Sequence, residues 1–181
     1  MNSDIRWGLP SDGHTFPIYA GSADDMDRVA EYAQERGVNH LRFGGDTWAL
    51  HTGDGPTISA ETATGEWTAT AVDAEKFSKA KSFEVKADRH TLQIVNESKQ
   101  NYVLNIDGQK AGQFTGEQRG LRNLHVEFEG QGEKLPLDVQ IFISWVARYC
   151  LESRVLNTTS AVMWFMIFLI PLAILVWLGA I

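Results

Sequence analysis

Residues 138–154 read DVQIFISWVARYCLESR, a stretch of helical length that is apolar on nearly all sides. Its polar residues recur at every fourth position and form one narrow stripe, which consists of Gln140, Ser144, Arg148 and Glu152. A helix with so little polar surface has to be covered by other elements on most sides. The pattern therefore predicts a buried helix. The alternative is an amphipathic helix that lies on a membrane surface.

Short β patterns precede this helix. Residues 83–87, 102–106 and 124–128 alternate apolar and polar side chains, which is typical of strands with one buried and one wet face. Asp107-Gly108 predicts a tight hairpin, because type I′ turns need a positive φ at both central positions. Further strands are expected over residues 38–43, 48–51, 67–72, 92–94 and 109–114. The sequence thus predicts an α+β fold, a mainly antiparallel β domain (sheet or barrel) packed around one apolar helix.

The beginning of the chain gives different signals. Residues 1–21 are expected to be irregular, because glycines and prolines interrupt any periodicity. Over residues 22–37 the apolar spacing is helical, Ser22 can cap the first turn and Gly37 can end the last one. We therefore expect a short amphipathic helix here, at the start of an α+β domain that spans residues 22–155.

The last 21 residues, AVMWFMIFLIPLAILVWLGAI, carry no charge. A helix of residues 161–181 is long enough to cross the hydrocarbon core of a bilayer, which is about 30 Å thick. Trp164 and Trp177 lie near its two ends, where indole rings favour the headgroup layer, and Phe168 and Pro171 lie between them. The sequence predicts a C-terminal transmembrane helix after a short polar linker, residues 156–160.

Three features predict the orientation of this helix. Arg148 and Arg154 precede it, and positive residues stay on the cytoplasmic side. The N-terminus lacks the apolar core of a secretory signal peptide. Cys150 is the single cysteine, which excludes an internal disulfide and is compatible with a reducing compartment. We expect a single-pass protein of the cell membrane whose N-terminal domain is cytoplasmic.

The sequence contains no motif of a known catalytic or metal site. Nucleotide-binding, serine-hydrolase and zinc-protease motifs are absent, and the five histidines are scattered without ligand spacing. The net charge of −7 argues against nucleic acid as a partner. We therefore expect no enzyme, no cofactor and no metal. Trp7, Trp48 and Trp67 could line a ligand pocket, fill a core or contact a partner.

The order of elements resembles the tubby-like fold, which is shared by phospholipid scramblases and the plant LURP-one-related proteins. The resemblance covers roughly residues 77–181. It rests on FEVKADRHTLQIVNES, the hairpin YVLNIDGQKAGQF, the strand HVEFEG and the helix LPLDVQIFISWVARYCLE. It implies a barrel threaded by the helix and binding of membrane lipid. It does not imply scramblase activity, because a calcium-binding acidic loop and a cysteine-rich palmitoylation segment have no counterpart here.

Two functions follow as hypotheses. The first is a non-catalytic, tail-anchored accessory subunit whose partner is a larger integral membrane protein complex, of which a respiratory supercomplex is one example. The second is a tubby-like protein that binds or handles lipid at the membrane surface.

Overall fold

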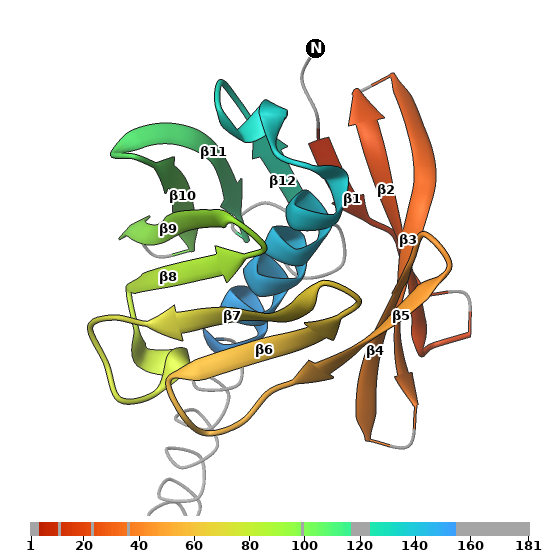
Figure 1. Cartoon of the computed structure of the whole chain (residues 1–181), viewed down its shortest axis with the longest axis horizontal. Coiled ribbons are helices and arrows are strands. Elements are labelled where there is room, and N and C mark those ends of the chain that lie inside the picture. Colours follow the sequence, from red (N-terminus) through yellow and green to blue (C-terminus); the bar gives the residue numbers. More distant parts are fainter. Residues whose placement is uncertain are drawn as a thin grey trace, which may run out of the picture.

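The computed structural model describes residues 4–10, 12–22, 24–35, 37–98, 100–116 and 124–154. These residues form a closed antiparallel barrel around one helix (Figure 1). The strands are β1 (Asp4–Trp7), β2 (Thr15–Ser22), β3 (Asp25–Glu35), β4 (Val38–Phe43), β5 (Asp46–His51), β6 (Thr57–Thr62), β7 (Gly65–Ala71), β8 (Ser82–Ala87), β9 (His90–Ser98), β10 (Asn101–Ile106), β11 (Gln109–Thr115) and β12 (His125–Phe128). Two 3₁₀ helices, η1 (Phe77–Lys79) and η3 (Gly132–Lys134), lie at the two ends of the barrel.

Each strand pairs with its neighbours in sequence, and β1 closes the barrel by pairing with β12. In that closing pair Ile5 lies opposite Val126, and both side chains are fully buried. Closure removes the free sheet edges to which other chains could add. The prediction of a mainly antiparallel β domain packed around one apolar helix is confirmed, and the domain is a barrel.

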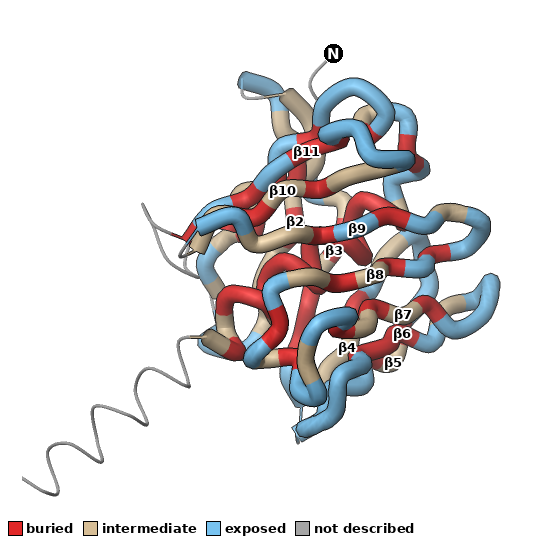
Figure 2. Tube along the Cα trace, turned by 90° about the vertical axis from the view of Figure 1, so that its left-hand side faces the viewer, coloured by how far each residue is buried: buried red, intermediate tan, exposed pale blue. Residues whose placement is uncertain are grey.

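The helix of residues 137–154 occupies the centre of the barrel (Figure 1). Its apolar side chains from Val139 to Leu151 are nearly all buried, and Phe142 packs edge-on against Trp67 of β7 at 5.6 Å between ring centroids. Figure 2 shows the matching alternation of buried and exposed positions along the strands. The helix is therefore the core of the barrel, and the alternative of a helix lying on a membrane surface is excluded.

The hairpin prediction at Asp107-Gly108 is also confirmed. Both residues have positive φ, 51° and 75°, and they join β10 to β11. Shortly before the turn, the strand register shifts between Leu104 and Asn105. This bulge adds twist to the hairpin.

Two predictions for the N-terminal part were wrong. Residues 1–21 are not irregular throughout, because β1 and β2 lie there. The stretch predicted as a helix, residues 22–37, contains β3 instead, and Gly37 (φ 83°) lies in the turn that leads into β4. Ala30 and Ala33 have the spacing of a helix, whereas Ala30 and Tyr32 alternate with Glu31 as in a strand. Pairing with β2 and β4 decided between the two.

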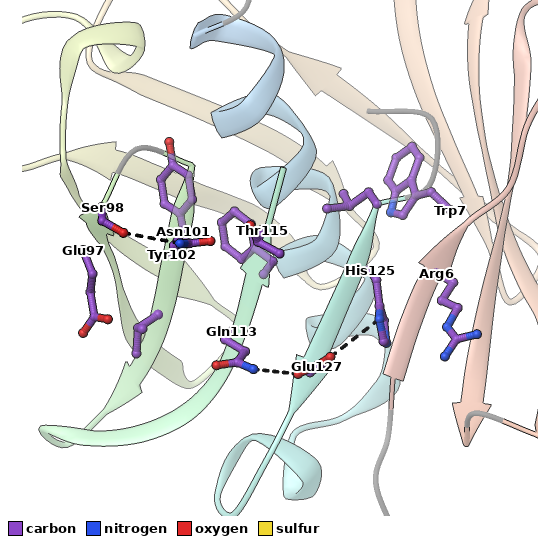
Figure 3. Close-up of a pocket in the computed structure, with 13 residues that line it drawn as sticks. Arg6, Trp7, Glu97, Ser98, Asn101, Tyr102, Gln113, Thr115, His125 and Glu127 are labelled. Carbon is purple, nitrogen blue, oxygen red and sulfur yellow. Dashed lines mark hydrogen bonds and ion pairs between the residues drawn. The ribbon is translucent and has the colours of Figure 1, made fainter. Parts of the chain in front are cut away.

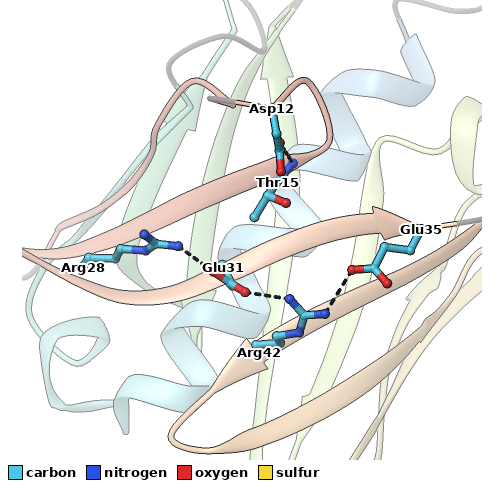
Figure 4. Close-up of polar contacts among 6 residues, drawn as sticks. All are labelled: Asp12, Thr15, Arg28, Glu31, Glu35 and Arg42. Atoms are coloured by element: carbon cyan, nitrogen blue, oxygen red, sulfur yellow. Dashed lines mark hydrogen bonds and ion pairs between the residues drawn. The ribbon is translucent and has the colours of Figure 1, made fainter.

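Ion pairs lie on the outer face of this region (Figure 4). Arg42 of β4 bridges two carboxylates of β3, Glu31 at 2.8 Å and Glu35 at 3.0 Å, and Arg28 also contacts Glu31. In the loop before β2, the carboxylate of Asp12 accepts hydrogen bonds from the backbone N–H groups of His14 and Thr15. These contacts agree with the pairing of β3 with β4 and with the turn before β2, and their exposed ion pairs add little stability.

Within the described part of the chain, no helix is long and apolar enough to cross a membrane. The predicted linker, residues 156–160, and the predicted transmembrane helix, residues 161–181, lie outside the described residues.

Candidate functional site

One end of the barrel, which we call the exit rim, surrounds the C-terminal end of the central helix. Arg154 marks it, because its guanidinium donates hydrogen bonds to the carbonyl of Ala80 (2.8 Å) and to Oδ1 of Asn96 (3.3 Å). The antiparallel order brings the ends of the odd-numbered strands and the starts of the even-numbered strands to this rim. The opposite rim holds η3 and the start of the helix.

A cavity of about 750 Å³ lies at the exit rim between β9, β10, β11, β12 and β1 (Figure 3). It is lined by Arg6, Trp7, Glu97, Ser98, Asn101, Tyr102, Val103, Gln113, Phe114, Thr115, Leu124, His125 and Glu127. No described residue of the central helix lines it, so the cavity lies beside the packed core and not within it. Its size falls in the range of pockets for small ligands.

Aromatic rings form the apolar side of this rim cavity. Tyr102 of β10 and Phe114 of β11 lie opposite each other across the hairpin, stacked with 4.6 Å between centroids and 7° between planes. Both are buried, as are Trp7 and Leu124. Burial raises the pKa of the Tyr102 hydroxyl far above its ordinary value, so that it stays protonated.

The other side of the rim cavity is polar. His125 Nε2 lies 2.9 Å from the buried carboxylate of Asp4, and His125 Nδ1 lies 3.7 Å from Glu127. Gln113 donates a hydrogen bond to Glu127 (2.7 Å). Figure 3 places Ser98 across the cavity from His125, so this hydroxyl is not paired with the histidine as a nucleophile would be. The arrangement is suited to binding an amphipathic group, with rings on one side and hydrogen-bonding groups on the other.

A second polar cluster lies inside the barrel, where the polar stripe of the helix meets β1, β2 and β3. Ser144 accepts a hydrogen bond from the Trp7 indole N–H (3.1 Å), and the side chain of Gln140 donates to the carbonyls of Gly132 and Leu135. These contacts satisfy groups whose burial would otherwise be costly.

Arg148 is the charged member of this stripe. Its guanidinium lies over three rings, Phe16 at 4.1 Å, Trp7 at 4.8 Å and Tyr32 at 5.5 Å. Its Nε lies 2.7 Å from a carboxylate oxygen of Glu152, one helical turn further on. Burial raises the pKa of Glu152 although the charge of Arg148 opposes the shift. Burial also raises the pKa of Tyr32, to about 12.

The structure separates the two arginines that were predicted to flank the membrane. Arg148 is buried inside the barrel and is only 7% exposed, so it is a core residue and not a membrane-proximal surface charge. Arg154 lies at the exit rim, with its guanidinium 5.5 Å from the Tyr102 ring. The predicted anchor residues lie outside the described residues: Trp164, Phe168, Pro171 and Trp177.

The three candidate tryptophans are all buried. Trp48 and Trp67 pack edge-on at 5.3 Å in the core, and only Trp7 reaches the rim cavity. The sequence reasoning missed the rings of Tyr102 and Phe114. The signal that could have found them is the hairpin centred on Asp107-Gly108, whose pairing brings the two rings close together.

Two features of the described residues bear on metal and thiol chemistry. They contain no group of three or more His, Cys, Asp or Glu side chains arranged to hold a metal ion. Cys150 is buried on the central helix, and desolvation raises the pKa of its thiol far above the ordinary value. A buried neutral thiol is a poor nucleophile.

Comparisons with protein-family models, with curated proteins and with solved structures found no significant match to this chain.

Proposed function

We propose that the chain is a non-catalytic, single-pass, tail-anchored accessory subunit of a larger membrane protein complex, with its barrel on the cytoplasmic side. The observation that carries this proposal is the course of the central helix. It fills the barrel, leaves at the exit rim and is followed in sequence by the apolar residues 161–181.

The connection between barrel and anchor is short in this proposal. Six residues, 155–160, separate the described helix from the apolar stretch. Fully extended, they would reach about 20 Å at ~3.3–3.6 Å per residue. The exit rim and its cavity would therefore stay near the bilayer, where they can contact the exposed part of an integral membrane partner.

The rim cavity is the proposed docking site. In the described part of the chain, the closed barrel leaves no free sheet edge for a partner, and the helix fills its interior. The rim cavity combines buried aromatic rings with hydrogen-bonding groups, which is the composition expected of an interface centre.

Purification of the full chain from its native membrane in a mild detergent tests the proposal. We expect stoichiometric partners, and a clean monomer would contradict it. Val103→Trp should narrow the cavity and reduce partner recovery. Val95→Trp is the matched control, because Val95 lies directly opposite Val103 on β9, is also half-buried and does not line the cavity. Equal recovery with both variants would place the docking surface elsewhere.

The second candidate is a lipid-binding protein of the tubby-like kind. Its support is the position of the rim cavity beside the proposed membrane anchor, together with the stacked rings of Tyr102 and Phe114. Mass spectrometry of the purified chain distinguishes the two functions. Lipid bound in the cavity should be retained with Val95→Trp and lost with Val103→Trp, whereas a docking subunit should carry no stoichiometric lipid in either variant.

A further inference from the structure

Large apolar side chains on the surface of the described residues are few, and most of them lie at one end. Val72 is 64% exposed, Leu9 is 59% exposed and Val38 is 48% exposed. All three belong to the exit rim. The other large hydrophobic side chain of this kind, Leu137, is 37% exposed and lies at the opposite rim, at the start of the helix.

The strand pairing places each of the three residues. Leu9 follows β1 and the residue Gly8, whose N–H bonds to the carbonyl of Pro17. Val38 is the first residue of β4 and pairs with the last residue of β3. Val72 follows β7, and its N–H bonds to the carbonyl of Ser82 at the start of β8. Each lies where a strand ends or begins at the exit rim.

The three residues are also spread around the rim. They lie at β1, β4 and β7, and these strands are evenly spaced in the order of the closed barrel. The remaining arc, around β10, contains the rim cavity. Apolar contacts on three sides and a cavity on the fourth therefore surround the end of the central helix.

We propose that the exit rim rests on the bilayer, with Leu9, Val38 and Val72 inserted into the headgroup layer around the central helix. The proposal depends on the membrane anchoring of the preceding subsection. The connection of residues 155–160 is short enough to hold the rim against the surface, and apolar side chains gain stability by leaving water. Three contacts spread around the rim hold the barrel axis close to the membrane normal.

The charges of the rim point to zwitterionic lipid as the contacting surface. Lys76, Lys79 and Lys81 lie around Ala80, whose carbonyl accepts a hydrogen bond from Arg154 at the end of the helix, but Asp73 and Glu75 directly precede them in sequence. The chain as a whole carries a net charge of −7. A basic patch that would favour anionic lipid is therefore not formed by this segment.

Site-specific fluorescence in proteoliposomes of the full chain tests the proposal. Each of the variants Leu9→Cys, Val38→Cys and Val72→Cys is labelled with an environment-sensitive dye, and Leu137→Cys serves as the matched control on the opposite rim. The only native thiol, Cys150, is buried and stays unlabelled. In phosphatidylcholine vesicles we expect the three rim labels to emit at shorter wavelength than the Leu137 label. We also expect brominated lipid to quench them, and iodide to quench them several-fold less than the control.

Flotation of the same vesicles separates this proposal from the proposed function. A chain that fails to float with the lipid refutes the anchor, and the rim contact with it. A second outcome is that the chain floats, but iodide quenches its rim labels as strongly as the Leu137 label. This result would agree with the anchor and would refute the contact of the rim with the bilayer. The rim labels could also become shielded from iodide only after a partner complex is added. This result would refute the contact with the bilayer and would indicate that the rim is a protein interface.

Discussion

Replacement of Arg148 by methionine is the most informative test of the barrel interior. Methionine keeps most of the length of the side chain and removes the charge. Arg148 lies over the rings of Phe16, Trp7 and Tyr32, and these rings come from β1, β2 and β3. Its ion pair with Glu152 lies within the same helix. The substitution therefore breaks a contact between the helix and the N-terminal strands, and it also leaves Glu152 without its partner.

The expected loss can be worked out from these contacts. A desolvated cation–π interaction contributes about 2 kcal/mol. Removing one member of a buried ion pair costs about 3–5 kcal/mol, because it strands the other charge. The Glu152 side chain is 31% exposed and keeps part of its hydration, which reduces the cost of leaving it unpaired to about 1 kcal/mol. We expect Arg148→Met to lower the free energy of unfolding by about 3 kcal/mol, or about 6–12 °C in melting temperature.

Chemical denaturation of the full chain in detergent, followed by tryptophan fluorescence, measures this loss. Arg42→Met is the matched control, because Arg42 also makes two ion pairs but is 44% exposed on the outer face. Exposed pairs contribute about 0–1 kcal/mol, so the control should stay close to the parent protein. The double variant Arg148→Met/Glu152→Leu should recover most of the stability. Equal effects of Arg148→Met and Arg42→Met would refute the assignment of Arg148 as a core residue.

Three further predictions concern packing and pH. Gly132→Ala should destabilise the barrel by about 1–3 kcal/mol or more, because the added Cβ would lie 1.8 Å from the carbonyl oxygen of Ala111. Thermal melting measures this loss, and Gly53→Ala is the control, because a Cβ at Gly53 would meet open space. The free energy of unfolding should fall as pH rises from about 4.5 through the raised pKa of Glu152. Glu152→Gln should flatten this part of the profile of stability against pH. A profile that is the same in the variant and the parent protein would contradict the burial of the carboxyl. Backbone hydrogen bonds lower the pKa of Asp12 from 3.8 to about 2, so its contribution should be lost as pH falls through that interval, and NMR titration of the carboxyl should show no step near 3.8.

The sequence was sufficient to predict most strands from residue 38 onward, including β4, β5 and β7. The alternation over residues 102–106 and the turn at Asp107-Gly108 are local signals, because strand faces and positive φ depend on neighbouring residues alone. The apolar helix could be predicted for the same reason. Its coverage on all sides followed from composition, although composition does not say which elements cover it.

Residues 1–37 could not be predicted, because their structure depends on distant partners. β1 is only four residues long and is held by β12, more than a hundred residues away in sequence. In β3 the spacing of Ala30 and Ala33 satisfies a helix locally, and only the neighbouring strands reveal the strand. The rim cavity was missed for a related reason, since its lining comes from both ends of the domain.

The central helix links these distant parts, and this has a consequence for the proposed anchoring. Ser144 bonds to Trp7 of β1, Arg148 packs on rings of the first three strands, and Arg154 bonds to the rim beside β8 and β9. The helix therefore cannot tilt against the strands without breaking buried contacts at several heights of the barrel. If residues 161–181 anchor the chain, its orientation at the surface is set by two constraints: the six-residue length of the connection, residues 155–160, and the apolar contacts proposed for the rim. A partner that binds the rim cavity would then meet it in one fixed orientation, which lowers the entropic cost of docking compared with a domain on a flexible tether.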